Sequence, residues 1–489
     1  MNGKVFLFGI GGTGSRVIKS LVMMAASGVD IQASAIVPII IDPDLANADL
    51  SRTIKQIKTY SAIRKSLDFT ASSENQFFKT NIEDVVNGYT LRLKDTKNKK
   101  FKEFIQYDTL GKENRALASI LFSENNLEAD MEVGFKGNPN IGSIVLNQFT
   151  DSEDFLAFAA AFKPGDRVFI VSSIFGGTGA SGFPLILKNI RSILSTMPNC
   201  DAIQNAPVGA ITVLPYFAVK PEENSQINSS TFVGKTKAAL HYYENNVTGN
   251  NSSVNVLYYI GDERNKQYDN KEGGKLQKNN AHIIELASAL SIVDFASIPD
   301  NDVAMVCDKD GNGRVYAPNP RFKEFGIDND TERVIFTDLT RKTRDIICVP
   351  MTQFVLLSKY LREHIKSALS LPWAKDNDFN ETFLKSSFMS DLEKITTSYL
   401  EWLREMDDND RGFKPFKIDI SKSQVFSIVE NVKPARVKGL KGFLKSGYDL
   451  FDAFLDSTHT SLPKSSKEQK FMELFYEVTD ELVNAKYNF

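Results

Sequence analysis

The sequence is poor in the residue types that most often build disulfide frameworks, redox centres and metal sites. Its 489 residues include three cysteines, four histidines and two tryptophans. Cys200, Cys307 and Cys348 are odd in number and far apart, so they form neither a disulfide framework nor a CxxC metal motif. The histidines are equally scattered, and no two have the spacing of metal ligands. This composition is typical of a protein in a reducing compartment.

Long apolar runs and an excess of one charge sign are also absent. The longest apolar stretches, around Ile36–Ile41 and Phe354–Leu357, are far shorter than the roughly 18 residues that a membrane-spanning helix needs. The 58 basic and 61 acidic residues give a net charge of −3, which provides no global field to attract nucleic acid or an anionic membrane. The first residues resemble a strand and not a signal peptide. We therefore expect a cytoplasmic protein with no transmembrane segment and no nucleic-acid partner.

What the sequence does contain is a series of short apolar strands separated by helical stretches. A helix is predicted from about Gly14 to Ala26, directly after the first strand. Near-continuous apolar strands that alternate with helices are typical of a parallel sheet covered on both faces. The predicted fold class is therefore α/β, with a doubly wound parallel sheet. The predicted strands are Val5–Phe8, Ile36–Ile41, Arg167–Ser172, Ala210–Leu214 and Val256–Ile260.

The remaining sequence predicts helical additions to this sheet. An inserted helical module is expected over about 47–132, and a long, mostly buried linking helix over about 279–296. A nucleotide-binding domain would then span 1–300. The second domain, 301–489, is predicted to start with a hairpin and to continue as a mainly α-helical region. The insertion and the C-terminal helices are the candidate surfaces for protein partners.

Two glycine-rich turns carry the strongest chemical signal. The first, GIGGTGS at residues 9–15, follows a strand and opens a helix. Glycine lets the backbone approach a ligand closely, and the unpaired amides at the start of a helix attract phosphate. Alone, this turn also fits a dinucleotide-binding Rossmann domain, with Asp42 as the acid that binds the ribose.

The second turn separates these alternatives. It is FGGTGASGFP, residues 175–184, which follows the predicted strand RVFIVSS and precedes a helix. Two units of strand, glycine turn and helix in one domain are what a di- or triphosphate held from both sides requires, whereas a Rossmann dehydrogenase needs only one. Hydroxyl groups among the glycines add donors, and hydrogen bonds to a charged group contribute roughly 1.5–3 kcal/mol each. The pair of turns therefore favours a nucleotide-phosphate site.

The second turn is similar to the signature loop of the tubulin and FtsZ family, which is GGGTGSG in tubulins and GGGTGTGAAP in FtsZ. Pro184 stands at the position of the FtsZ proline. The stretch GFKGNPNIG at 134–142 resembles the FtsZ loop that contains GNPxxG, and Asp44 resembles the aspartate of the loop after the second strand. Over roughly 1–300 the chain is thus similar to bacterial tubulin-like proteins.

This resemblance implies that guanine nucleotide is the partner, with GTP or GDP and Mg²⁺ as cofactors. It also implies GTPase activity and self-association into cytoskeletal filaments. Pro215 and Glu222 or Glu223 fall where the family contacts the ribose, and Asn279 or Asn280 falls where it reads the guanine edge. The resemblance places the phosphates against Gly11, Gly12, Thr13, Gly14, Ser15, Asp44, Gly137, Asn138, Phe175, Gly176, Gly177, Thr178, Gly179 and Ala180.

The sequence departs from the family in the part that would complete catalysis. FtsZ carries GxxNxDxxD after its long helix, whereas this chain has FASIPDNDV, which offers Asp300 and Asp302 without that pattern. The resemblance implies that such an acid acts on the nucleotide of a neighbouring subunit. Binding is therefore predicted more directly than hydrolysis or filament formation. Two alternatives stay open: a non-hydrolysing nucleotide-binding scaffold, and an NAD(P)-dependent oxidoreductase that uses only the first glycine turn and Asp42.

Overall fold

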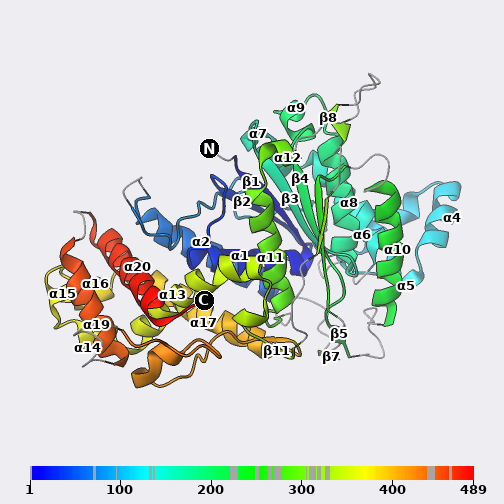
Figure 1. Ribbon diagram of the computed structural model, residues 1–489. Helices are drawn as coiled ribbons and strands as arrows, with labels where there is room; N and C mark the ends of the chain where they lie inside the picture. Colours follow the sequence, from blue (N-terminus) through cyan, green and yellow to red (C-terminus); the bar gives the residue numbers. More distant parts are fainter. Residues whose placement is uncertain are drawn as a thin grey trace.

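Figure 1 shows the computed structural model of the chain. The structure describes all residues except 1–2, 70–72, 95, 132–134, 136–137, 221–229, 248–252, 263–266, 269–277, 304–305, 308–314, 317–320, 325–330, 438–445 and 462–464. Within the described part, no helix is long and apolar enough to cross a membrane.

A six-stranded sheet with every neighbouring pair parallel forms the centre of the fold (Figure 1). Its order is β10-β6-β4-β3-β1-β2. Every residue of β1, β2, β3 and β4 is buried, because both faces of the sheet are covered. The predicted α/β class and parallel sheet are confirmed, and β10 adds a strand outside the predicted set. The strands are β1 Val5–Ile10, β2 Ile36–Ile41, β3 Arg167–Ser173, β4 Val208–Val213, β6 Val256–Ile260 and β10 Arg321–Glu324.

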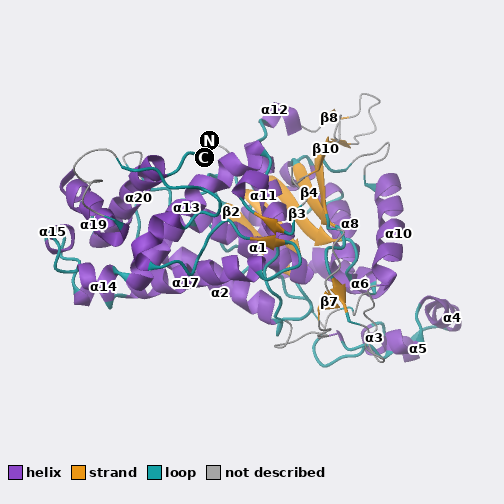
Figure 2. Cartoon of the chain, turned by 60° about the horizontal axis from the view of Figure 1, so that its bottom comes forward, coloured by secondary structure: helices purple, strands orange, loops and turns teal. Residues whose placement is uncertain are grey.

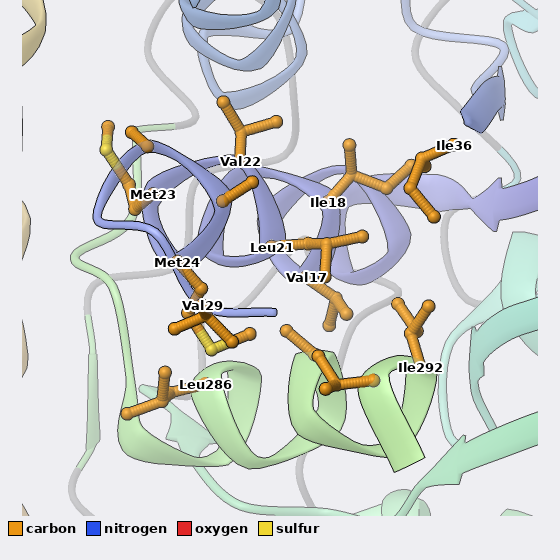
Figure 3. Packing of buried hydrophobic residues seen from close by; sticks show 14 of the residues in the cluster. Val17, Ile18, Leu21, Val22, Met23, Met24, Val29, Ile36, Leu286 and Ile292 are labelled. Carbon is orange, nitrogen blue, oxygen red and sulfur yellow. The ribbon is translucent and has the colours of Figure 1, made fainter. Parts of the chain in front are cut away.

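Helices cover both faces of this sheet. On one face lie α1 (Gly11–Ala26) and α11 (Ile283–Ser297), which pack against each other with Val17 of α1 and Ile292 of α11 directed into their interface (Figure 3). On the same face, Phe169 of β3 contacts Phe295 of α11, with ring centroids 5.3 Å apart. On the other face lie α6 (Pro139–Leu146), α7 (Glu153–Ala161) and α8 (Gly177–Arg191). The sheet is therefore doubly wound.

The region between β2 and β3 starts on the sheet domain and then leaves it. Helix α2 (Ala48–Lys65) packs on α1, and Ile82 and Thr90 form parallel bridges to Ile36 and Ile40 of β2. The following short helices project from one end of the molecule (Figure 2). They are α3 Phe101–Phe104, α4 Lys112–Leu121 and α5 Glu124–Leu127.

Further elements lie between the later strands of the sheet or connect the sheet to the C-terminal half. The predicted hairpin appears as β8 and β9, which pair antiparallel, and β5 pairs with β7. These elements are α9 Cys200–Gln204, α10 Ser230–Asn246, α12 Asp300–Val303, β5 Ala218–Val219, β7 Gln267–Tyr268, β8 Val306–Cys307 and β9 Val315–Tyr316.

The C-terminal half is mainly helical and packs against α1 and α2 rather than standing apart (Figure 1). Trp402 of α17 donates from Nε1 to Oγ of Ser20 at 3.3 Å, and Glu405 pairs with Lys19 at 2.9 Å. The two halves therefore share buried contacts. The elements are α13 Arg341–Glu363, α14 Ile365–Ala368, α15 Pro372–Lys375, α16 Glu381–Leu384, α17 Ser387–Asp407, α19 Gly447–Thr458 and α20 Lys467–Lys486, with β11 Arg333–Val334 beside β12 Gly412–Phe413.

Candidate functional site

The two glycine turns lie side by side at the carboxyl edge of the sheet. Strands β1 and β3 are parallel neighbours, with Gly9 opposite Val171, and each runs directly into its glycine turn. A Cβ atom placed on Gly11 would lie 3.4 Å from the Cβ of Thr178. The turns therefore meet across the gap between adjacent strands, as two loops that share one ligand must.

A helix begins in each glycine turn, and the N-terminus of each helix has no side-chain cap. Helix α1 begins at Gly11, three residues earlier than predicted, and α8 begins at Gly177. Among the described residues, neither helix has a side chain that caps its first amides, and neither carries an acid in its first turn. By contrast, Asn138 caps α6 and Ser152 caps α7. Two free helix starts, each with a partial positive charge, favour an anion between them.

Two of the predicted phosphate-binding glycines have a packing role. A Cβ on Gly14 would come within 2.4 Å of the carbonyl carbon of Gly9, and one on Gly179 within 2.4 Å of the carbonyl oxygen of Ser173. Any side chain at these positions would collide with backbone. Gly14 and Gly179 are therefore needed to let α1 and α8 pass directly over the strand ends. Gly11 is different, since it adopts φ +67° and has open space beyond Thr178.

Polar atoms without partners gather beside the first turn. Asp42, at the end of β2, is 5% exposed; its Oδ1 accepts from the amide of Asp44 at 3.0 Å, while its Oδ2 has no partner within the described part of the chain. Burial raises the pKa of Asp42 to about 7. The fully buried Oγ of Ser15 likewise has no partner there. Buried polar atoms are usually paired, so these two groups are available to a polar ligand at the first turn.

The predicted GNPxxG-like loop lies against the second turn. Gly137 falls outside the described residues, whereas Asn138 accepts from the amide of Asn140 at 3.0 Å and starts α6. A Cβ on Gly142 would lie 2.2 Å from Oγ of Ser181, so α6 packs tightly on α8. The start of α6 is thereby held next to the start of α8.

The remaining predicted contacts divide into packing residues and residues of the loop after β4. Phe175 is buried in an aromatic group with Phe217 at 5.6 Å and Phe232 at 5.0 Å, so its ring supports the loop. Pro215 follows β4 at the same sheet edge, and its carbonyl accepts from the amide of Asp262 at 3.3 Å. Glu222 and Glu223 lie outside the described residues.

A buried ionic network next to the first turn was not predicted from the sequence. Arg16, one residue beyond the glycine turn, donates from Nε to Glu285 at 2.5 Å and from its NH2 group to the hydroxyl of Tyr216 at 2.9 Å. Asp49 lies 3.4 Å from the NH1 group. Burial by itself would lower the pKa of Arg16, but Tyr216, Glu285 and Asp49 reverse this and hold it above its ordinary value. The network joins α1, α2, α11 and the loop after β4.

The predicted base-reading residues lie at this network. The amide and the side-chain Nδ2 of Asn279 both donate to Asp49, at 3.1 and 2.9 Å. His282 caps α11 by accepting from the amide of Ile284 at 3.1 Å, and burial lowers its pKa to about 4. Asn279 and His282 line a small pocket of about 30 Å³. Its lining residues are Arg16, Tyr216, Phe217, Asn279, Asn280, His282, Glu285 and Asn409.

The predicted catalytic acids lie at the amino ends of the strands, whereas the glycine turns lie at the carboxyl ends. Asp300 in α12 accepts from Arg167 at 2.5 Å, and Arg167 is the first residue of β3, whereas the glycine turn follows its last residue, Ser173. A strand of this length spans about 20 Å. Asp302 belongs to the same short helix. Neither acid can therefore reach the glycine turns of its own chain.

These features define a parallel α/β protein in which two glycine turns converge at the carboxyl edge of the sheet. The sequence matches no family model and no curated protein. The solved structures that are similar to it include two archaeal proteins. They are CetZ2 from Haloferax volcanii in a GTPγS-bound protofilament (13% identity, 61% of this chain and 60% of that chain, TM-score 0.29) and CetZ from Methanosaeta thermophila strain DSM 6194 (16%, 60% and 52%, TM-score 0.27). Such distant likenesses assign no function.

Proposed function

We propose that this chain is a tubulin-like nucleotide-binding protein that holds the phosphates of GTP or GDP, with Mg²⁺, between its two glycine turns. The observation that carries the proposal is the approach of Gly11 to Thr178, which brings two uncapped helix starts to one place. A Rossmann oxidoreductase would need only the first turn and would leave the second without a role.

The charge distribution supports a phosphate ligand. The starts of α1 and α8 each present unpaired amides and a partial positive charge of roughly half a unit. No acid stands in the first turn of either helix, so nothing in these turns competes with a bound anion. Hydrogen bonds from such amides to a charged phosphate contribute about 1.5–3 kcal/mol each. The turns therefore supply most of the binding energy in this proposal.

The polar groups beside the first turn fit a hydrated Mg²⁺ ion. The unpartnered Oδ2 of Asp42 and Oγ of Ser15 are hard oxygen donors, which Mg²⁺ prefers. When bound, the ion would supply positive charge that neutralises the phosphates. Asp44, whose Oδ1 accepts from the amide of Ala46 at 3.1 Å, would hold the shape of this loop.

The base would lie at the network of Arg16 and Asp49. Guanine presents acceptors at O6 and N7 and a donor at its exocyclic amine. Arg16 offers donors and Asp49 offers acceptors, and Asn279 is already bound to Asp49. The pocket of about 30 Å³ must widen to admit a purine, so base binding would rearrange these contacts.

Calorimetric titration of the purified chain with GTP, ATP and NAD, each with Mg²⁺, tests this function. The proposal predicts binding of GTP in preference to NAD, and loss of that binding in Gly177→Val, which places a branched side chain at the start of α8 while leaving the sheet folded. Equal indifference to all three ligands would refute it. Preferential binding of NAD would instead support the oxidoreductase.

Hydrolysis and filament formation are separate parts of the proposal. Asp300 or Asp302 of one subunit would orient water at the nucleotide of the next, in a head-to-tail contact between opposite sheet edges. Phosphate release, light scattering and electron microscopy, each with and without GTP, measure these two properties. A chain that binds GTP, stays monomeric and releases no phosphate would be a non-hydrolysing scaffold.

A further inference from the structure

Helix α4 displays an apolar stripe that nothing in the described structure covers. Leu117 is 55% exposed, Ile120 81% and Leu121 52%. Their spacing of three and four residues places all three on one face of the helix. Ala118 is the buried residue of α4, so the helix touches the rest of its own chain along a different face. Adjacent large apolar side chains at such exposure mark a contact surface.

A groove that is also lined by apolar side chains lies between α13 and α17. Leu361 and Leu384 are half-buried in its walls, and Leu400 is buried at its base. The hollow has a volume of about 330 Å³, which is at the small end of ligand-sized pockets. Such a groove can take a few aliphatic side chains from one helix, which is the way amphipathic helices bind in grooves.

The charges around the two surfaces are complementary. Arg362 and Lys366 line the groove and are exposed, and neither is in an ion pair with a described residue. Glu393 is the acid that lines it. On α4, Glu113 lies four residues before Leu117, on the face of the stripe, and it too has no ion-pair partner in the described part of the chain. The acid Glu113 on α4 can thus pair with the cations Arg362 and Lys366 at the groove.

The two surfaces lie at opposite ends of one molecule, which is visible in both Figure 1 and Figure 2, where α4 and α14 mark the two ends. They cannot meet within one chain. A surface and its complement at different places on the same molecule produce a head-to-tail contact, which continues from copy to copy when the rotation does not close a ring.

We propose that α4 of one copy inserts its stripe of Leu117, Ile120 and Leu121 into the α13–α17 groove of a second copy, with Glu113 directed at Arg362 and Lys366. The partner is therefore this chain itself. The contact involves neither glycine turn, so it forms without nucleotide. One short helix buries less surface than a standard interface, and the affinity is accordingly micromolar rather than nanomolar.

Sedimentation velocity over a range of concentrations, without nucleotide, tests the contact. The unaltered chain self-associates, and Ile120→Asp weakens the association at least about tenfold. Leu384→Asp, on the groove side, has the same effect. Ser119→Asp, on α4 but outside the stripe, leaves the association unchanged. Circular dichroism establishes that each variant is folded.

Mixing the variants identifies the two surfaces as partners. Ile120→Asp keeps an intact groove and Leu384→Asp keeps an intact stripe, so an equimolar mixture forms a dimer that grows no further. A mixture that stays monomeric overturns the proposal. Loss of association in Ile120→Asp but not in Leu384→Asp also overturns the proposal, because α4 would then bind another α4 or a different surface.

A charge reversal gives a second test that alters only exposed residues. Glu113→Lys weakens the association about two- to fivefold, and adding Lys366→Glu in the same chain restores it. Absence of any such rescue contradicts the proposed orientation. Because all these measurements omit nucleotide, their failure would leave the GTP titration and the proposed function unaffected.

Discussion

Gly11 and Thr178, far apart in sequence, lie so close that a Cβ on Gly11 would be 3.4 Å from the Cβ of Thr178. Their proximity follows from the parallel pairing of β1 and β3, whose carboxyl ends open into the two turns. Because the turns touch, a substitution in one should affect a ligand held by both.

Gly11→Ala should lower both stability and nucleotide affinity. Gly11 adopts φ +67°, a conformation that costs other residues roughly 1–2 kcal/mol, and its new methyl group would face the second turn. Gly165→Ala is the matched control, because Gly165 has φ +90° with no atom within 4 Å of the added Cβ and lies at the opposite edge of the sheet. Urea unfolding should show a similar loss of stability for both variants, and GTP titration should show weakened binding only for Gly11→Ala. Equal affinities would contradict a ligand between the turns.

Arg16→Met should strongly destabilise the fold. The substitution leaves the carboxylate of Glu285 buried without its ion-pair partner, while Asp49 keeps Arg52 at 3.8 Å, and breaking a buried pair in this way typically costs about 3–5 kcal/mol. Adding Glu285→Leu removes this unpaired charge and should recover part of that loss. Denaturant unfolding of the two variants measures this coupling. Simple additivity of the two losses would argue against a shared network.

The raised pKa of Asp42 should make the free energy of unfolding fall as pH rises. Its pKa is raised from 3.8 to about 7 in the folded chain, so the folded state binds more protons than the unfolded state between these values. The contribution of Asp42 is full below about pH 4 and is lost as pH rises to about 7, with a size on the order of 4 kcal/mol.

The comparison with Asp42→Asn isolates this effect. His282, whose pKa is lowered from 6.5 to about 4, acts in the opposite direction, since its contribution is lost as pH falls from about 6.5 to 4. Both chains retain His282, so the difference in unfolding free energy between them reports Asp42 alone. That difference should shift in favour of the variant from pH 4 to 7. A difference independent of pH would mean that Asp42 is not buried in this way.

Asp300→Asn with Asp302→Asn should separate binding from hydrolysis. Both acids lie at the sheet edge opposite the glycine turns, so GTP affinity should be unchanged, while phosphate release should drop at least about tenfold if a neighbouring subunit supplies the acid. For the unaltered chain, the rate of phosphate release should also rise more than linearly with protein concentration. Phosphate release that is unaffected in the double variant would rule out both acids.

The sequence predicted five of the six strands of the main sheet because each contains a short, mostly apolar run, which is typical of a sheet covered on both faces. It did not predict that the helix starts at Gly11, since a run of three glycines and two hydroxyl residues, GGTGS, is typical of a loop. Arg16 also escaped notice, because its partners Glu285 and Tyr216 approach it only through the tertiary fold. Asp300 was identified from family resemblance, and its distance from the turns depends on where α11 ends.

A structure determined by crystallography or cryo-electron microscopy in the presence of GTP and Mg²⁺ tests the central claim most directly. The account predicts phosphate density between the amides of residues 11–15 and 176–179, in contact with both helix starts. Nucleotide density at any other place, or turns that stay empty at saturating GTP, would contradict it.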